Sequence, residues 1–191
     1  KKVIEIAKKN NIWVFSDECY EQLTYDKKFT SIATLDKKYN KILTFQSCSK
    51  TYAMTGWRIG YTAGNKDVIQ AMSKLQGQST SCPNSIAQYA AVEALTGDQS
   101  IVLKMKNSFK IRRDLMVNRL NNIKGISCLI PGGAFYAFPN FKNYIGKSLN
   151  NTKIKSATQI TMYLLEKKYV VSVPGKEFGS PNNIRFSYAI S

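Results

Sequence analysis

Three short apolar runs in the first third of the chain constrain its fold more than any other feature. The runs are IWVFSDE (12–18), KILTFQS (41–47) and RIGYTAG (58–64), and each ends in polar or small residues. Apolar runs of this length predict buried strands. Helical patterns precede or follow them at 1–10, 66–77, 84–96 and 100–122. This alternation predicts a doubly wound α/β layer with a mostly parallel sheet.

The second part of the chain predicts a different layer. ISCLI (126–130) and AFYAF (134–138) flank the turn Pro131-Gly132-Gly133 and predict two strands. A helix is expected near 156–168, with further strands in VVSV and in IRFSYA near the end of the chain. This pattern indicates a smaller α+β domain. We place the boundary in the helix at 100–122, which predicts domains of residues 1–105 and 106–191.

The net charge of +16, from 28 basic and 12 acidic residues, raises nucleic-acid binding as an alternative function. The lysines are scattered in pairs such as Lys8-Lys9 and Lys37-Lys38, and no arginine-rich stripe or recognised binding motif is present. We therefore do not expect nucleic acid as a partner. No apolar run approaches the length that crosses a bilayer, so a membrane is not expected either.

Four cysteines stand far apart and form no CxxC pair, so neither a zinc site nor a disulfide framework is predicted. A reducing cytoplasm is the expected location. Histidine is absent, which removes the commonest general base and metal ligand. We expect no metal site, and proton transfer must use another group. The chain opens inside a helical pattern and stops just after a strand-like run, so we expect a piece cut at both ends.

The segment SCSKTYAMTGWRIG (47–60) carries the chemistry of the first domain. A lysine that forms an imine must present a neutral amine, which a neighbouring cation favours. Lys50 has Arg58 eight residues later, and Ser47 and Ser49 beside it. Hydroxyls and a guanidinium suit a phosphate dianion. The combination suggests pyridoxal phosphate, although spacing alone leaves an ordinary polar loop as the alternative.

This segment resembles the lysine signature of class-I, fold-type I pyridoxal-phosphate-dependent aminotransferases. The matching positions are Ser47, Cys48, Ser49, Lys50, Ala53, Met54, Gly56, Arg58, Ile59 and Gly60. The continuation over 60–97 is similar to the bacterial aspartate/prephenate branch. The resemblance implies that Lys50 is the Schiff-base lysine and that Arg58, Ser47 and Ser49 bind the cofactor phosphate. It also implies a complete enzyme about twice as long, with this chain holding the C-terminal part of the large domain and a truncated small domain.

Asp17 ends the first predicted strand, where a carboxylate also has the ordinary use of capping a turn. A carboxylate can instead hold a pyridine nitrogen protonated. The family motif SDExY is present at residues 16–20. The resemblance therefore implies that Asp17 contacts the ring nitrogen and that Tyr20 reaches the phenolic oxygen. The family segment RFSYA implies that Arg185 binds the substrate α-carboxylate, although an isolated arginine in a strand is usually solvated or ion-paired.

The implied activity is transfer of an amino group from an L-amino acid, aspartate, to a 2-oxo acid, 2-oxoglutarate, in a cytoplasmic homodimer. The exact donor, including any use of prephenate, stays open. Related enzymes with the same lysine catalyse elimination or cyclisation, so a lyase is the alternative. A third hypothesis is an inactive fragment, because the family's remaining site residues precede the segment seen in this chain.

Overall fold

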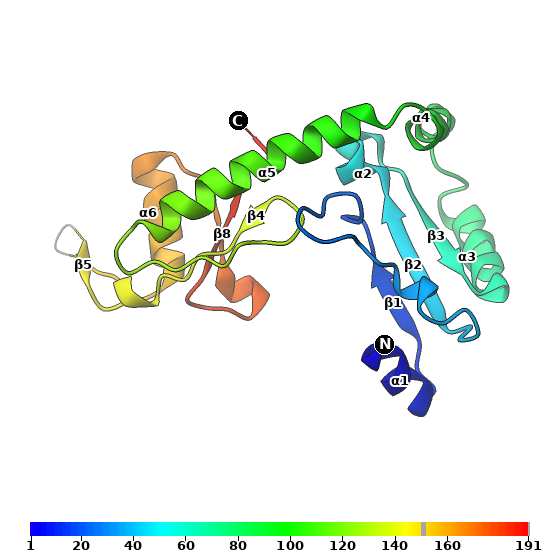
Figure 1. Cartoon of the computed structure of the whole chain (residues 1–191), viewed down its shortest axis with the longest axis horizontal. Coiled ribbons are helices and arrows are strands. Elements are labelled where there is room, and N and C mark those ends of the chain that lie inside the picture. The colour runs from blue at the N-terminus through cyan, green and yellow to red at the C-terminus, as the bar shows by residue number, and fades with distance from the viewer. Residues whose placement is uncertain (150–151, 191) are drawn as a thin grey trace. The chain divides into compact units, whose positions relative to one another are not determined.

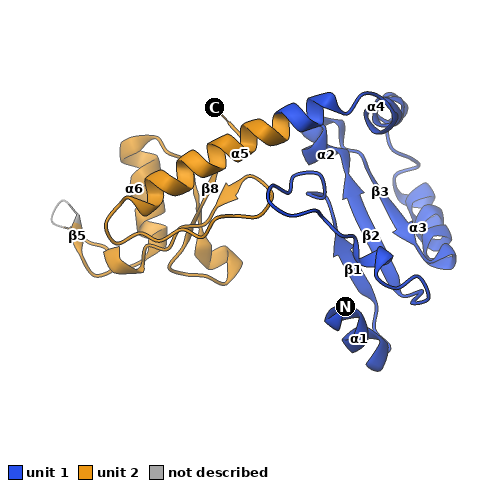
Figure 2. Cartoon of the chain, viewed as in Figure 1, with its two compact units in different colours: residues 1–104 blue, residues 105–191 orange. Residues whose placement is uncertain are grey.

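The computed structural model describes residues 1–149 and 152–190. The chain divides into two compact units, Lys1–Lys104 and Met105–Ser191 (Figure 2). The division falls within α5 (Ser100–Asn121), the helix where the sequence places a boundary. Assignment of these parts to the large and small domains of an aminotransferase stays a prediction.

A three-stranded sheet in the order β1-β2-β3 forms the centre of the first unit (Figure 1). Its strands are β1 (Val14–Asp17), β2 (Ile42–Ser47) and β3 (Gly60–Gly64). β1 and β2 are parallel, whereas β3 is antiparallel to β2. All three predicted strands are present, but the direction of β3 differs from the parallel neighbours of a doubly wound sheet. The connection from β2 to β3 contains only short turns of helix, whereas a crossover between parallel strands usually contains a full α-helix.

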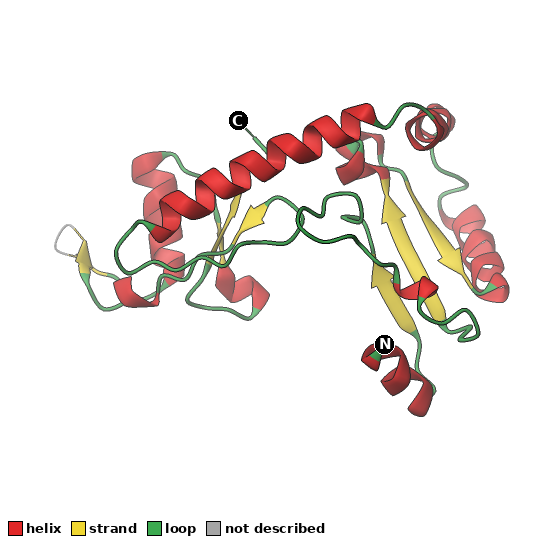
Figure 3. Ribbon diagram, in the orientation of Figure 1, coloured by secondary structure: helices red, strands yellow, loops and turns green. Residues whose placement is uncertain are grey.

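Helices and turns complete this unit (Figure 3). They are α1 (Lys2–Lys9), η1 (Ile32–Thr34), α2 (Cys48–Thr51), η2 (Thr55–Trp57), α3 (Lys66–Ser79) and α4 (Ser85–Thr96), where η denotes a 3-10 helix. Residues 42–44 of β2 are buried. A separate apolar cluster of Cys48, Met54 and Ala91 packs α4 against the segment that carries Lys50. The position of that segment therefore depends on buried apolar contacts.

The second unit contains an antiparallel sheet in the order β4-β8-β7. Its elements are β4 (Tyr136–Ala137), η3 (Lys142–Tyr144), β5 (Ser148–Leu149), β6 (Thr152–Lys153), α6 (Ala157–Lys168), β7 (Val173–Pro174), η4 (Gly175–Phe178) and β8 (Ile184–Ser187). β5 and β6 pair with each other and were not predicted. Phe141, Ala157 and Ile184 form the buried core that joins α6 to the sheet.

The predicted strand at 126–130 is wrong. Only Ser127 pairs there, in an isolated antiparallel bridge with Asn140. The side chain of Asn121 replaces a strand neighbour, because its Oδ1 accepts from Cys128 N at 2.8 Å and its Nδ2 donates to Cys128 O at 3.0 Å. Among the described residues, no helix is long and apolar enough to span a bilayer, and no group of three metal-binding side chains occurs.

Candidate functional site

The carboxyl ends of the parallel strands β1 and β2 carry Asp17 and Ser47. Parallel strands end at the same edge of a sheet, where α/β folds bind ligands. A cavity of about 540 Å³ lies at this edge and is lined by Asp17, Cys19, Phe45, Gln46, Ser47, Ser49, Lys50, Thr55 and Arg58. Five of the predicted site residues, Asp17, Ser47, Ser49, Lys50 and Arg58, therefore surround one cavity.

A single helical turn, α2, presents Lys50 to this cavity. Ser47 begins the turn, and its Oγ accepts a hydrogen bond from Ser49 N at 3.1 Å. Cys48 and Thr51 are buried on the opposite side of the turn, whereas Lys50 is half-buried. Burial raises the pKa of the Cys48 thiol, in agreement with a packing role for that side chain. The alternation of buried and cavity-lining residues fixes the orientation of the lysine.

Arg58 enters the cavity from a left-handed backbone position, with φ 53° and ψ 49°. A non-glycine residue in this region costs about 1 kcal/mol. Its Nη1 donates to the carbonyl of Thr55 at 2.8 Å, which orients the guanidinium toward the cavity. The strained backbone and this hydrogen bond together hold a cation beside Lys50.

Asp17 has both a capping contact and a place in the cavity. Its Oδ1 accepts from Cys19 N at 3.1 Å, which closes the turn after β1. Burial, assisted by the hydrogen bond and negative charge of Asp17, raises the pKa of the Cys19 thiol to about 11. The carboxylate is therefore held rigidly at the cavity wall.

Tyr20 is not among the side chains that line this cavity. It lies in the turn after β1 and is half-buried, and its carbonyl accepts from Leu23 N at 2.9 Å. Its contact with a cofactor oxygen stays a prediction.

Glu18 is a residue of this region whose role the sequence reasoning missed. Its side chain is buried, and its Oε1 accepts from Ser16 Oγ at 3.0 Å, Ser31 Oγ at 3.0 Å and Ile32 N at 3.2 Å. Its Oε2 accepts from Gln46 Nε2 at 3.3 Å. Glu18 thus joins the end of β1, the η1 loop and β2 behind the cavity. Its position in the SDExY motif, beside Asp17, was the available signal.

Four other cavity-lining residues were not predicted: Cys19, Phe45, Gln46 and Thr55. Gln46 immediately precedes Ser47 and Cys19 immediately precedes Tyr20, whereas Phe45 lies two residues before Ser47. Thr55 lies within the lysine segment, and its carbonyl orients Arg58. Their position near the ends of predicted strands was the only sequence feature that could have indicated that they line the cavity.

Arg185 lies on β8 in the second unit and is half-buried. Its guanidinium carbon is 4.5 Å from the centroid of the Tyr136 ring and 4.6 Å from that of the Phe178 ring. Within the described residues it has no acidic partner within ion-pair distance. The sequence left open that Arg185 is an ion-paired surface residue, and this arginine is not ion-paired to any described residue.

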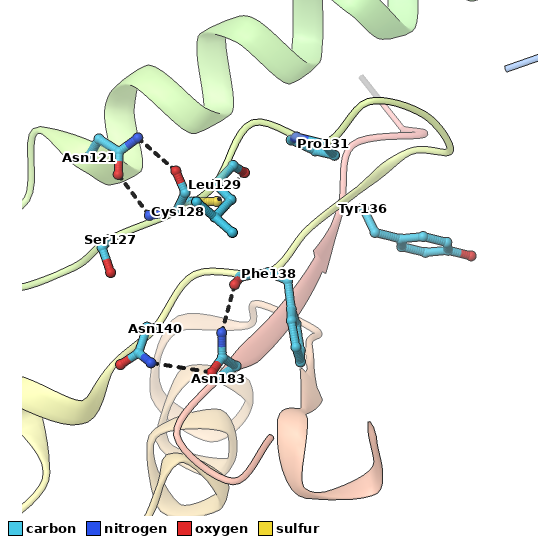
Figure 4. A pocket seen from close by; sticks show the side chains of 9 residues that line it. All are labelled: Asn121, Ser127, Cys128, Leu129, Pro131, Tyr136, Phe138, Asn140 and Asn183. Carbon is cyan, nitrogen blue, oxygen red and sulfur yellow. Dashed lines mark hydrogen bonds between the residues drawn. The ribbon is translucent and has the colours of Figure 1, made fainter. Parts of the chain in front are cut away.

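A second cavity, of about 470 Å³, lies in the second unit (Figure 4). Its polar wall is a network in which Asn183 Nδ2 donates to Phe138 O at 2.8 Å and Asn140 Nδ2 donates to Asn183 Oδ1 at 3.4 Å. Asn121, on the opposite wall, is bonded to the backbone of Cys128. These amides bond to the backbone and stabilise the fold. We therefore assign this cavity no functional role.

The first unit is thus a mixed α/β fold whose strand-end cavity is lined by an amine, a guanidinium, a carboxylate and three hydroxyl side chains. The model of the family "Aminotransferase class I and II" matches residues 1–191. The aspartate/prephenate aminotransferase of Cereibacter sphaeroides is 46% identical over 181 residues, which cover 93% of this chain and 45% of that protein. The aspartate aminotransferase of Bacillus subtilis is 43% identical over 189 residues, which cover 98% of this chain and 47% of that protein.

Solved structures give the same result. The crystal structure of an aspartate aminotransferase from Rhizobium meliloti superposes with a TM-score of 0.92 at 43% identity, over 97% of this chain and 47% of that one. The chain belongs to the class I and II aminotransferase family. It spans about half the length of the curated relatives it matches.

Enzymes of this family use pyridoxal phosphate, and the donor set of the first cavity fits that cofactor. Lys50 offers an amine for covalent attachment, Arg58 with Ser47 and Ser49 offers donors for a phosphate, and Asp17 offers a carboxylate for a ring nitrogen. A volume of about 540 Å³ lies within the usual range of small-molecule sites.

Proposed function

We propose that the whole protein is a pyridoxal-phosphate-dependent aminotransferase that moves the amino group of L-aspartate to 2-oxoglutarate. The observation that supports this most is the convergence of Lys50, Asp17 and Arg58 on one cavity at the carboxyl ends of two parallel strands. The donor amino acid becomes a 2-oxo acid, and the acceptor 2-oxo acid becomes an amino acid. No external oxidant or reductant is required.

The cofactor, when bound, supplies an electron sink for the pair released as the substrate Cα proton leaves. Asp17 holds positive charge at the ring nitrogen, and Tyr20 donates to the phenolic oxygen. Arg58 and Ser47, with Ser49, bind the phosphate and so fix the orientation of the ring.

Lys50 has two roles in this proposal. Its Nζ would be the point of covalent attachment of the cofactor, and as a free amine it would take the Cα proton of the substrate as a general base. Histidine is absent from the chain, so this amine is the general base that the segment offers. Arg185 binds the substrate α-carboxylate through its guanidinium.

The proposal extends to the organisation of the whole protein. Residues 1–105 form the C-terminal part of the cofactor-binding large domain, and residues 106–191 belong to the small domain. The protein is a homodimer in the cytoplasm, with an amino acid and a 2-oxo acid as its ligands and without nucleic-acid or membrane partners.

The test uses the whole protein reconstituted with pyridoxal phosphate. Borohydride reduction followed by peptide mass spectrometry should place the cofactor on Lys50, and Lys50→Ala should abolish both the adduct and turnover. Lys74→Ala on α3, outside the cavity, is the matched control and should retain both. Undiminished trapping in Lys50→Ala would sink the assignment.

A second measurement separates the chemistry from that of a lyase. With aspartate and 2-oxoglutarate, glutamate should appear in equal amount to the aspartate consumed, and ammonia should not. Release of ammonia from the amino acid alone would indicate elimination instead. Prephenate, pyruvate and aromatic 2-oxo acids, offered as alternative acceptors, then define the specificity.

A further inference from the structure

The guanidinium of Arg185 lies over two aromatic rings that come from both flanks of its strand. Tyr136 belongs to β4 on one side of β8, and Phe178 ends η4, which directly follows β7 on the other side. Both ring centroids lie within 4.6 Å of the guanidinium carbon, inside the range of cation–π attraction. Two aromatic rings thus lie within cation–π distance of one guanidinium.

The edge of this guanidinium, in contrast, has its N–H donors available. In the described part of the chain, no hydrogen bond or ion pair to Arg185 occurs. Arg112 donates to the carbonyl of Ala189 at 2.8 Å, and Arg113 is paired with Asp114. Arg185 therefore contacts two aromatic rings, and its N–H groups make no hydrogen bond or ion pair within the described residues.

Each of the two rings also contacts another aromatic ring. Phe178 meets the Phe138 ring edge-on at a centroid distance of 6.0 Å, and Tyr136 lies 4.8 Å from the ring of Phe135. Asn183 Nδ2 donates to the carbonyl of Phe138 at 2.8 Å, whereas Figure 4 shows the Tyr136 ring pointing away from these amides. Tyr136 is half-buried and Phe178 is exposed, and each of them has a further aromatic neighbour.

We propose that Tyr136 and Phe178 are positioning residues that act through Arg185, holding its guanidinium so that the N–H edge meets a planar carboxylate in a bidentate pair. The inference rests on the proposed function, in which Arg185 binds the substrate carboxylate. An arginine already fixed by stacking loses little freedom when a carboxylate arrives. Two rings this close to the guanidinium carbon restrict the directions from which a carboxylate can approach it.

The test measures binding of succinate, a dicarboxylate without an amino group, to the cofactor-loaded whole protein by calorimetry, together with the KM and kcat for L-aspartate. Phe178→Leu and Tyr136→Leu should each raise the succinate dissociation constant and the KM about tenfold. Phe178→Tyr and Tyr136→Phe keep a ring and should stay within about twofold of the parent. The kcat and the fraction of cofactor bound should change far less, a split that general misfolding would not produce.

The variant Arg185→Lys distinguishes an error in the role of Arg185 from an error in the role of the two rings. If it leaves succinate binding unchanged, the assignment of Arg185 in the proposed function is wrong and the positioning role falls with it. If it weakens binding strongly while both leucine variants bind as the parent does, only the positioning role is wrong. Phe178→Leu combined with Arg185→Lys should bind no more weakly than Arg185→Lys alone, whereas multiplied effects would overturn action through Arg185.

Discussion

The carboxylate of Glu18 and the side-chain amide of Gln46 are hydrogen-bonded at 3.3 Å across the ends of two parallel strands. Glu18 is only 3% exposed, and its other oxygen accepts three further hydrogen bonds. A buried carboxylate with four donors is a rigid connection between β1, β2 and the η1 loop. Asp17 and Ser47, which line the cavity, are each next in sequence to one member of this pair.

Replacement of Glu18 by glutamine should destabilise the fold, because a neutral amide oxygen accepts weaker hydrogen bonds from Ser16, Ser31 and Ile32 than a carboxylate does. We expect Glu18→Gln to lower the free energy of unfolding by about 2 kcal/mol, measured by urea denaturation. Glu93→Gln, at an exposed position of α4, is the matched control and should change it by less than about 0.5 kcal/mol. Equal stability of the two variants would contradict the proposed connection.

Arg58→Gly should separate cofactor binding from stability. Glycine adopts φ near 53° without strain, and this relief offsets the greater freedom of glycine in the unfolded chain, so unfolding should change by less than about 1 kcal/mol. Loss of the guanidinium should weaken pyridoxal phosphate binding about 10- to 100-fold, followed by absorbance titration.

Ala53→Gly is the control for Arg58→Gly, since Ala53 has the same φ of 53° and carries no charge. It should give a similar change in stability and keep cofactor affinity within about twofold. If both variants bind the cofactor equally well, Arg58 does not bind the phosphate.

Local signals were sufficient for the elements that are defined by their own residues. Asn65, Asn84 and Ser156 begin α3, α4 and α6, and the side chain of each accepts backbone hydrogen bonds at the helix start. At the strand predicted for 126–130, the side chain of Asn121 bonds the N–H and C=O of Cys128, a contact between segments that apolar periodicity does not encode.

In the candidate site, too, local sequence predicted some residues, whereas others depend on contacts between distant segments. The motif at 47–60 predicted Lys50 and Arg58, and both line the cavity. The bonds of Glu18 depend on the path of the η1 loop, which no sequence pattern in that loop predicts. The rings beside Arg185 likewise come from β4 and η4, and their meeting depends on the strand order β4-β8-β7.

Cys19 should react slowly with alkylating reagents despite lining the cavity, because its thiol pKa is raised to about 11. At pH 8, iodoacetamide should modify the exposed Cys82 well before Cys19, as measured by peptide mass spectrometry. Saturating pyridoxal phosphate should slow modification of Cys19 further and leave Cys82 unchanged. Faster reaction at Cys19 than at Cys82 would contradict this environment.

The raised pKa of the Cys19 thiol also makes the stability of the fold depend on pH. The unfolded chain releases the Cys19 proton near pH 9, whereas the folded protein retains it until about pH 11. The stabilisation is thus fully present below pH 9 and is lost as the pH rises to about 11. Cys48 and Cys128, whose pKa values burial also raises, act in the same direction. Urea denaturation between pH 8 and pH 11 should show a shallower decline in Cys19→Ala.

Gly64 at the end of β3 should tolerate no larger residue, because a Cβ there would lie 2.6 Å from the carbonyl oxygen of Ile42 and would overlap Leu43 Cδ2. We expect Gly64→Ala to lower the free energy of unfolding by about 1–3 kcal/mol, since the β2–β3 pair must separate to admit the methyl group. Gly77→Ala in α3, where no atom lies within 4 Å of the added Cβ, should instead raise it by about 0.5–1 kcal/mol. Urea denaturation of both variants checks the sign, and two changes in the same direction would show that the close approach of β2 to β3 does not limit residue 64.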